Sequence, residues 1–257
     1  MTIAAGAEAP SRRDRLRAAT KDEIIQTARG LLVRDGPGSV TLRAIAREMG
    51  MTAPGLYRYF ASHEELVRHV IASIFTELGA DINRALDEVP DSDQPTVKLT
   101  HAMAAACHEF RHWALRHKDE FALIFGAPLP GIDDSRNDIA DECALQLGGI
   151  FFGLFLELWE KARFAVPDPD QIDPGLREQL TRYGNALGAD VPAGAILTFL
   201  RCWVLLYGTV SMEVFGHLVF ALGDPAPMFE ITVGEMARLV GLRYPLLSVP
   251  PRPARRS

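Results

Sequence analysis

A small residue, a glycine and a large apolar residue follow one another at spacings of four and six in the segment "LRAIAREMGMTAPGLYRYF". They are Ala46, Gly50 and Leu56. Two helices that cross closely need a small side chain at the crossing, a glycine for the sharp turn and an apolar side chain that anchors the second helix. This spacing predicts a helix-turn-helix, with a first helix near Thr41–Gly50 and a second near Thr52–Phe60.

The rest of the chain repeats apolar residues at the helical period and shows no convincing strand pattern. Thr20 and Glu23 form a capping box that opens a helix ending at "DGPGS", and Ser62 with Glu65 opens another helix in the same way. The periodicity therefore predicts an all-α fold. The remaining helices are expected near Thr96–His117, 118–126, Ser135–Arg163, Pro174–Tyr183, Ala193–Leu222 and Pro227–Leu242.

Composition separates a small head and a larger body from two tails. Residues 1–19 and 245–257 are rich in Pro, Ala or Arg and lack periodicity, which predicts a disordered basic tail and a disordered Pro/Arg tail. Between them we expect a three-helix, helix-turn-helix head at 20–66 and a larger helical bundle at 67–244.

The net charge of −6 hides an asymmetry between the two ends of the chain. Residues 1–60 hold ten Lys and Arg against six Asp and Glu, a balance of +4, whereas residues 61–257 hold seventeen against twenty-seven, a balance of −10. A positive head on an acidic body suggests that the head alone meets a polyanion. Charge by itself leaves open the alternative that the head is simply solvated.

The cysteines and the apolar stretches bear on the cellular compartment. Cys107, Cys143 and Cys202 lie far apart, so neither a zinc ribbon nor a disulfide framework is indicated, and a reducing cytoplasm fits best. The longest apolar stretch could span a membrane by length, but Arg201 and Glu213 interrupt it. We therefore expect a cytoplasmic protein without membrane contact.

The second helix of the predicted motif begins with residues suited to a close approach. Thr52 can cap it, Pro54 falls in the first turn, and Gly55 adds no side chain. Behind this start, Tyr57 to Tyr59 are left facing outward, and phenols and arginine are ligands for phosphates and base edges. The segment therefore predicts a recognition helix in the major groove of DNA. The alternative is that the tyrosines only pack.

The stretch "VTLRAIAREMGMTAPGLYRYFASHEELV", with the helix before it, resembles the DNA-binding domain of the tetracycline-repressor (TetR) family. The resemblance covers about residues 20–75. At the position of the usual family lysine this chain has His63, which is a weaker anion partner when neutral. The segment and the resemblance together predict DNA contacts at Thr41, Arg43, Thr52, Ala53, Pro54, Gly55, Tyr57, Arg58, Tyr59 and His63.

The C-terminal region is similar to an actinobacterial subgroup of the same family, which carries a Trp-x-x-x-His-Gly stretch followed by Ser-x-Glu. The matching segment here is "WVLLYGTVSMEVFGH", with Tyr207 in place of the histidine, and "WALRHKDEFALIFG" is also similar. This resemblance implies a domain that binds an effector and forms a homodimer.

One motif points to a different class of protein. "HEFRH" is a literal H-E-x-x-H, which on a helix places His108 and His112 on one face beside Glu109. The alternative function is therefore a zinc-dependent hydrolase or a metal sensor. A zinc hydrolase also needs a third protein ligand, and neither His101 nor His117 is marked as one.

Aromatic residues gather in consecutive helical segments of the predicted body. Much of this set must be core, but helices of this kind also wall apolar pockets. The expected effector-lining residues are His108, His112, Trp113, Phe125, Phe152, Phe155, Trp159, Trp203 and Tyr207.

These observations converge on a homodimeric transcriptional regulator, expected to be a repressor that a small-molecule effector releases from a palindromic operator in double-stranded DNA. The last two long helices, Ala193–Leu222 and Pro227–Leu242, are expected to build the dimer. No catalytic residue, metal or cofactor is expected.

Overall fold

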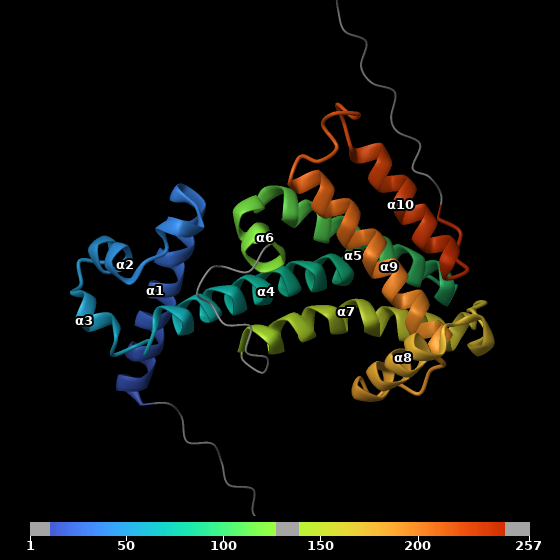
Figure 1. The fold of residues 1–257 in the computed structure, drawn as a ribbon, viewed down its shortest axis with the longest axis horizontal. Helices are drawn as coiled ribbons and strands as arrows, with labels where there is room; N and C mark the ends of the chain where they lie inside the picture. The colour runs from blue at the N-terminus through green and yellow to red at the C-terminus, as the bar shows by residue number, and fades with distance from the viewer. Residues whose placement is uncertain (1–10, 127–138, 245–257) are drawn as a thin grey trace, which may run out of the picture. The chain divides into compact units, whose positions relative to one another are not determined.

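The computed structural model describes residues 11–126 and 139–244, and all regular elements in these two ranges are helices (Figure 1). The all-α prediction is therefore confirmed for the described part of the chain. The chain divides into two compact units, Met1–Glu77 with His117–Leu145 and Leu78–Arg116 with Gln146–Ser257. Two long helices, α4 (His63–Asp87) and α7 (Ile139–Ala162), contribute residues to both units.

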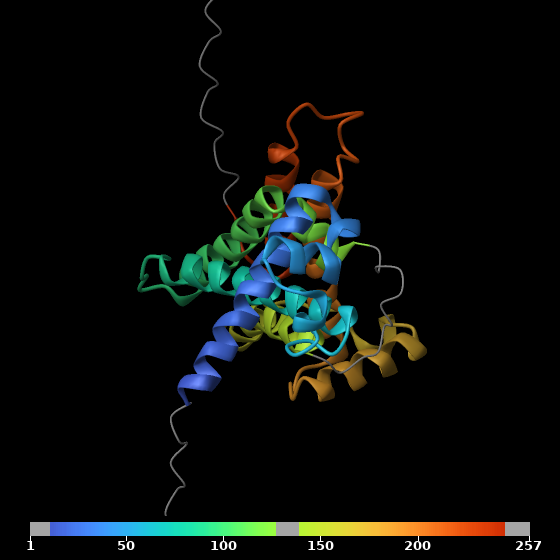
Figure 2. The same ribbon diagram turned by 90° about the vertical axis from the view of Figure 1, so that its left-hand side faces the viewer.

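The first unit contains the predicted head. In Figure 2, α1 (Arg12–Asp35), α2 (Leu42–Glu48) and α3 (Ala53–Leu56) lie together, and the short helices η1 (Pro37–Ser39) and α6 (Lys118–Phe125) belong to the same unit. The apolar stripes that gave the helical period face inward. Fully buried core residues are Ile24, Ala28, Leu32, Ile45, Leu56, Phe60 and Leu66.

The crossing and the turn of the helix-turn-helix have the geometry that the sequence predicts. Ala46 is buried at 3% exposure, and Leu56 is fully buried. Gly50 has a φ of +64°, a left-handed conformation that costs other residues strain. The amide of Gly50 donates to the Arg47 carbonyl at 3.3 Å, and that of Met51 donates to the Ala46 carbonyl at 2.8 Å. These two bonds close α2 in a Schellman motif, so the chain turns sharply toward α3.

The predicted start of the first helix is wrong. Helix α1 begins at Arg12, because the Ser11 hydroxyl accepts from the Asp14 amide at 3.2 Å and caps it. Thr20 lies inside the helix, where its hydroxyl donates to the Leu16 carbonyl at 3.0 Å. Residues 12–19 are therefore helical and not a disordered tail. The rest of the two predicted tails, 1–10 and 245–257, falls outside the described residues.

The second unit is a bundle around α9 (Ala193–Val214). Helix α9 packs against α5 (Pro95–Arg116), α8 (Pro174–Ala186) and α10 (Ala226–Leu239), and Figure 1 shows α9 and α10 side by side. A short helix, η2 (Pro169–Gln171), precedes α8. Buried aromatic and aliphatic side chains fill the centre of the bundle: Phe110, Trp113, Phe155, Leu158, Ile196, Leu206 and Phe229.

Helix α9 ends eight residues before its predicted end at Leu222. Gly216 has a φ of +71°, and the His217 amide donates to the Met212 carbonyl at 2.8 Å, so another Schellman motif closes the helix. The apolar residues after Gly216 lie in turns that continue to Ala221.

Candidate nucleic-acid interface

The ten predicted DNA contacts come from three places in the first unit: the start of α2, the short helix α3 with the turn after it, and the start of α4. Seven of them are exposed, namely Thr41, Arg43, Thr52, Pro54, Tyr57, Arg58 and His63, and the other three, Ala53, Gly55 and Tyr59, are half-buried.

One contact caps the start of α2, and a second contact joins it to the start of α4. The Thr41 hydroxyl accepts from the Ala44 amide at 3.2 Å and caps α2. His63, the first residue of α4, contacts the Val40 carbonyl through Nε2. An Nε2–H that bonds Val40 orients the imidazole, and His63 is therefore held next to the cap of α2.

Helix α3 is a single turn, shorter than predicted. The Gly55 amide donates to the Thr52 carbonyl at 2.8 Å, but the Thr52 side chain makes no capping bond, so the predicted cap is wrong. A Cβ atom at Gly55 would lie 3.3 Å from Thr52 Oγ1. A side chain at Gly55 would therefore make a tight contact with Thr52.

The turn after α3 presents Tyr57 and Arg58 to solvent. The Tyr57 side chain is 56% exposed, whereas Tyr59 is half-buried. Arg17 of α1 donates through Nη2 to the Arg58 carbonyl at 2.9 Å, and its guanidinium lies 5.9 Å from the centre of the Tyr59 ring. Tyr59 therefore packs against α1, and Arg17 supports the turn. The basic run "SRRDRLR" in the sequence contains this arginine, but its composition led to the prediction of a disordered tail.

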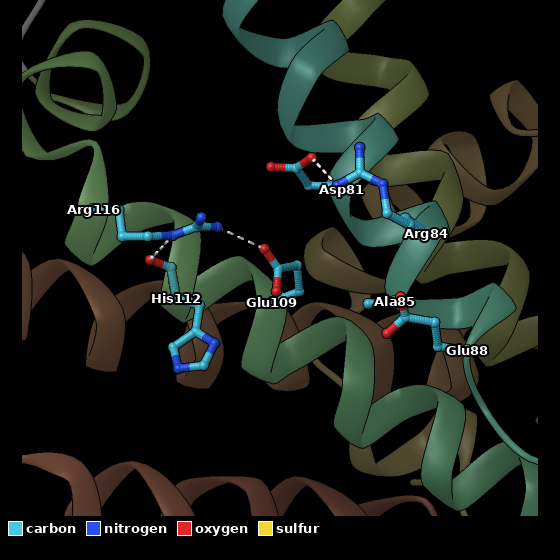
Figure 3. A pocket seen from close by; sticks show the side chains of 7 residues that line it. All are labelled: Asp81, Arg84, Ala85, Glu88, Glu109, His112 and Arg116. Carbon is cyan, nitrogen blue, oxygen red and sulfur yellow. Dashed lines mark hydrogen bonds and ion pairs between the residues drawn. The ribbon is translucent and has the colours of Figure 1, made fainter.

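The residues of the H-E-x-x-H motif do not share a partner. His108 Nε2 lies 2.8 Å from Glu230 Oε1 on α10, and Glu109 pairs with Arg116 at 2.9 Å. His112 and Glu109 line an open, polar cleft of about 470 Å³ between α4 and α5 (Figure 3). Within residues 11–126 and 139–244 no group of three or more side chains could hold a metal ion. The described structure therefore offers the motif no third zinc ligand.

The predicted effector-lining residues divide into core and cavity positions. Trp113 is fully buried, and Phe152, Phe155 and Trp159 are at most 7% exposed. Phe125 belongs to the first unit, where it packs on Phe75 and Phe121 with ring centres 5.6 and 4.9 Å away.

Two small apolar cavities of about 20 Å³ each lie in the second unit. The first includes Phe155 and Trp203 from the predicted set, and Tyr207 stacks on Trp203 at 6.2 Å. The second extends to Thr100 and Tyr244. Both cavities share three walls: Met103, Cys107 and Met236.

Burial suppresses ionisation of the groups that face these cavities. It raises the pKa of the Cys107 thiol to about 12 and that of the Cys202 thiol to about 11. Burial and the neighbouring Glu230 carboxylate also raise the pKa of Tyr244, whose hydroxyl donates to Glu230 at 3.2 Å. The cavity walls are therefore uncharged at neutral pH.

Two family profiles match the chain: "Bacterial regulatory proteins, tetR family" over residues 24–70 and "Tetracyclin repressor-like, C-terminal domain" over residues 103–236. Among curated proteins, the chain is 27% identical over 210 residues to the HTH-type transcriptional regulator Rv1816 of Mycobacterium tuberculosis, covering 81% of this chain and 86% of the relative. It is 26% identical over 123 residues to the HTH-type transcriptional repressor KstR2 of Mycolicibacterium smegmatis, covering 47% of this chain and 58% of the relative.

Solved structures of other proteins share the fold of this chain. The crystal structure of the regulatory protein SCO4313 matches with a TM-score of 0.68 and 25% identity, over 88% of this chain and 98% of that one. A structure from Rhodococcus sp. RHA1 shares the fold at a TM-score of 0.58 and 20% identity, over 92% of this chain and 100% of that one. Because the C-terminal profile alone matches more than half of the chain and the N-terminal profile covers the helix-turn-helix, the protein belongs to the TetR family of DNA-binding transcriptional regulators.

Proposed function

We propose that this regulator is a dimeric repressor, and that a small, mainly apolar effector releases it from a palindromic operator. The observation that carries the DNA-binding half of this proposal is the exposed Tyr57–Arg58 turn, supported from below by Arg17. Exposed phenol and guanidinium groups on a helix-turn-helix suit contacts with phosphates and base edges. The repressor role is supported by the Mycolicibacterium relative, an HTH-type transcriptional repressor that matches about half of this chain.

The effector proposal is supported by the paired cavities of the second unit. Each holds about 20 Å³, which is roughly the space of one water molecule, so neither admits an effector in this conformation. Their shared walls include Met103 and Met236, whose unbranched side chains repack easily. Movement of these two side chains would join the cavities into one apolar site, so an effector would select a conformation different from the one described.

The homodimer proposal is supported by an exposed apolar face on α9, α10 and the turn between them. A groove of about 340 Å³ on α9 is lined by Leu197, Leu200, Arg201, Val204 and Leu205. Glu213 near the end of α9 does not need a partner subunit to balance its charge, because it pairs with Arg111 inside the subunit at 2.5 Å. The large exposed apolar side chains of this face are Val204, Met212, Phe215, Val219, Phe220, Met228 and Ile231.

A second copy of the chain accounts for this face better than a membrane does. Within the described ranges, α9 has the length and composition of a membrane span, and 44% of its apolar window is buried inside the protein. A helix packed on three neighbours is a core helix with one face to cover. We therefore propose a cytoplasmic homodimer, with the Trp-His-Gly subgroup as the kind of TetR protein to which it is most similar.

The experiment starts from the purified protein and fragmented genomic or random duplex DNA. We expect recovered fragments to share two inverted half-sites, and we expect apolar compounds that bind the protein to release it from them. Recovery of no common sequence would contradict operator binding. Ligands that bind the protein without changing DNA affinity would contradict effector control, because an effector acts only through different affinities for two states.

A further inference from the structure

An open groove of about 630 Å³ lies in the first unit between the start of α1 and the turn after α3. Seven side chains line it, and four of them are arginines: Arg12, Arg13, Leu16, Arg17, Thr20, Arg58 and Tyr59. The groove therefore combines a dense positive charge with an apolar wall from Leu16 and Tyr59.

The positive charge of this groove is largely uncompensated. Across the described residues, no ion pair is formed by Arg12, Arg13 or Arg58. Asp14, the acidic residue of the first turn of α1, is bonded to the Ser11 hydroxyl at 2.6 Å. No carboxylate is among the groove's lining residues.

The groove is tied to the proposed recognition turn by a defined contact. Arg13 and Arg17 are four residues apart on α1, so both face the same side of the helix. Arg17 donates to the Arg58 carbonyl at 2.9 Å, which links the first turns of α1 to the turn that carries Tyr57. A ligand in the groove would therefore lie close to any base contacted by that turn.

The groove also lies largely outside the part of the chain that the family profile recognises. The N-terminal profile begins at residue 24, whereas five of the seven lining residues precede residue 21. The first turns of α1 are thus a feature of this chain that the matched family region does not describe.

We propose that this groove binds the sugar–phosphate backbone of the DNA duplex whose bases the Tyr57–Arg58 turn contacts. Arginine is a strong partner for phosphate oxygens, and such contacts set register and affinity without reading sequence. Leu16, at 60% exposure, and Tyr59 offer apolar contacts to deoxyribose. This inference rests on the proposed recognition turn, but it concerns separate residues.

The test removes two of the arginines that line the groove, both in the first turn of α1. R12A/R13A is compared with the parent and with R182A/R243A, which removes the same charge from exposed positions in the second unit. The probes are a duplex recovered with the parent protein and a scrambled duplex of equal length, titrated between 50 and 200 mM salt. Two lost phosphate contacts should lower the slope of log affinity against log salt by about 1.8 and weaken both probes alike.

The controls for this test are a measurement of helix content and two further double variants. Alanine is a better helix former than arginine, so α1 should keep its helical circular dichroism in R12A/R13A. R12K/R13K retains the charge and should retain most of the salt slope. R182A/R243A should match the parent.

Three outcomes would overturn the inference in distinguishable ways. If the parent binds its recovered duplex and R12A/R13A shows the same salt slope, the groove does not contact phosphate. If R12A/R13A loses preference between the two probes, the arginines read bases and not the backbone. If the parent binds no duplex at all, the proposed DNA recognition itself fails, and the groove assignment with it.

Discussion

At the scale of single residues, Tyr57 and Arg58 are the side chains that most directly test the recognition turn. Tyr57 is 56% exposed, so loss of its hydroxyl should not disturb packing. We expect Tyr57→Phe to weaken binding to all duplexes by about tenfold, since a hydrogen bond to a charged group contributes about 1.5 kcal/mol. Arg58→Ala should weaken binding uniformly or relax one base position.

Fluorescence anisotropy with recovered and scrambled duplexes measures both effects. Tyr183→Phe, at a 39% exposed tyrosine of α8, is the matched control and should bind as the parent does. Parent-like affinity in both Tyr57→Phe and Arg58→Ala would show that the recognition turn lies elsewhere.

The cysteines give a prediction that depends on pH. With pKa values of about 12 and 11, the buried Cys107 and Cys202 thiols are ionised in roughly one molecule in ten thousand and one in a thousand at pH 8. Only the thiolate reacts with maleimide, so native protein should be labelled at half-buried Cys143 alone. Unfolded protein should be labelled at all three positions.

The raised pKa values of the two thiols also make the stability of the protein depend on pH. Unfolding returns both thiols to ordinary pKa values near 9, so the unfolded state loses protons first and stability from these groups falls as pH rises above that value. Mass spectrometry of labelled peptides identifies the sites. Fast labelling of Cys107 or Cys202 in the native protein at pH 8 would contradict their burial.

The exposure of Tyr57 and Arg58 was easier to predict from the sequence than the long-range contacts that support their turn. Tyr57 and Arg58 follow from helical spacing alone, because Leu56 and Phe60 must face the core. The contact of His63 with the Val40 carbonyl joins residues 23 positions apart and has no local signature. The bond from Arg17 to the Arg58 carbonyl spans 41 positions and is equally invisible in a local pattern.

At the scale of the elements, an ion cluster centred on the buried pair Arg29–Glu120 joins three helices of the first unit. Arg29 of α1 lies 2.8 Å from Glu77 of α4 and 2.6 Å from Glu120 of α6, and His117 also contacts Glu120. Burial lowers the pKa of Arg29, but the two carboxylates more than offset it and hold the pKa above its ordinary value. Arg29 therefore stays charged in this site, and the two carboxylates compensate its charge.

We expect Glu120→Ala to destabilise the protein by about 3 kcal/mol, because it leaves a buried guanidinium with one partner fewer. The matched control is Glu178→Ala, which breaks the Arg182–Glu178 pair between side chains more than 70% exposed and should cost less than about 0.5 kcal/mol. Urea unfolding followed by circular dichroism gives both values. Equal midpoints for the two variants would show that the cluster contributes no more than a surface pair.

The helical period of the apolar residues predicted which segments form helices, but it did not predict where those helices begin and end. The apolar pattern continues through Val219 and Phe220, so period alone extended α9 past the Schellman motif at Gly216. At the other end of the chain, the arginine-rich composition of residues 12–19 concealed a helix that Ser11 caps. In both places a single residue with a specific backbone role outweighed composition.

At the scale of the whole molecule, the sequence pattern predicted a head and a body. It did not predict which segments of the chain each compact unit contains. The compact unit that contains the helix-turn-helix also includes His117–Leu145, which the sequence assigned to the body. The bond from Arg29 to Glu120 crosses 91 positions of the chain, and period and composition carry no information about such a pairing.

The exposed apolar face of α9 and α10 leads to the last prediction, which concerns the dimer. Val204 is 66% exposed on α9, and Val219 is 77% exposed in the turn that follows. Side chains this apolar and this exposed are stabilised when a second copy covers them. A carboxylate at either position would be buried without a partner in the dimer, but it would be solvated in the monomer.

We therefore expect Val204→Glu and Val219→Glu to yield folded monomers with unchanged helical circular dichroism at micromolar concentration, measured by sedimentation. Leu176→Glu, which places the same charge at a 39% exposed apolar position on α8, should remain dimeric. Monomers engage one half-site at a time and lose the effective concentration that links two heads, so affinity for a two-half-site duplex should fall by about a hundredfold or more. Variants that stay dimeric, or a parent that sediments as a monomer, would show that this face has another occupant, because the charge would then meet no second copy.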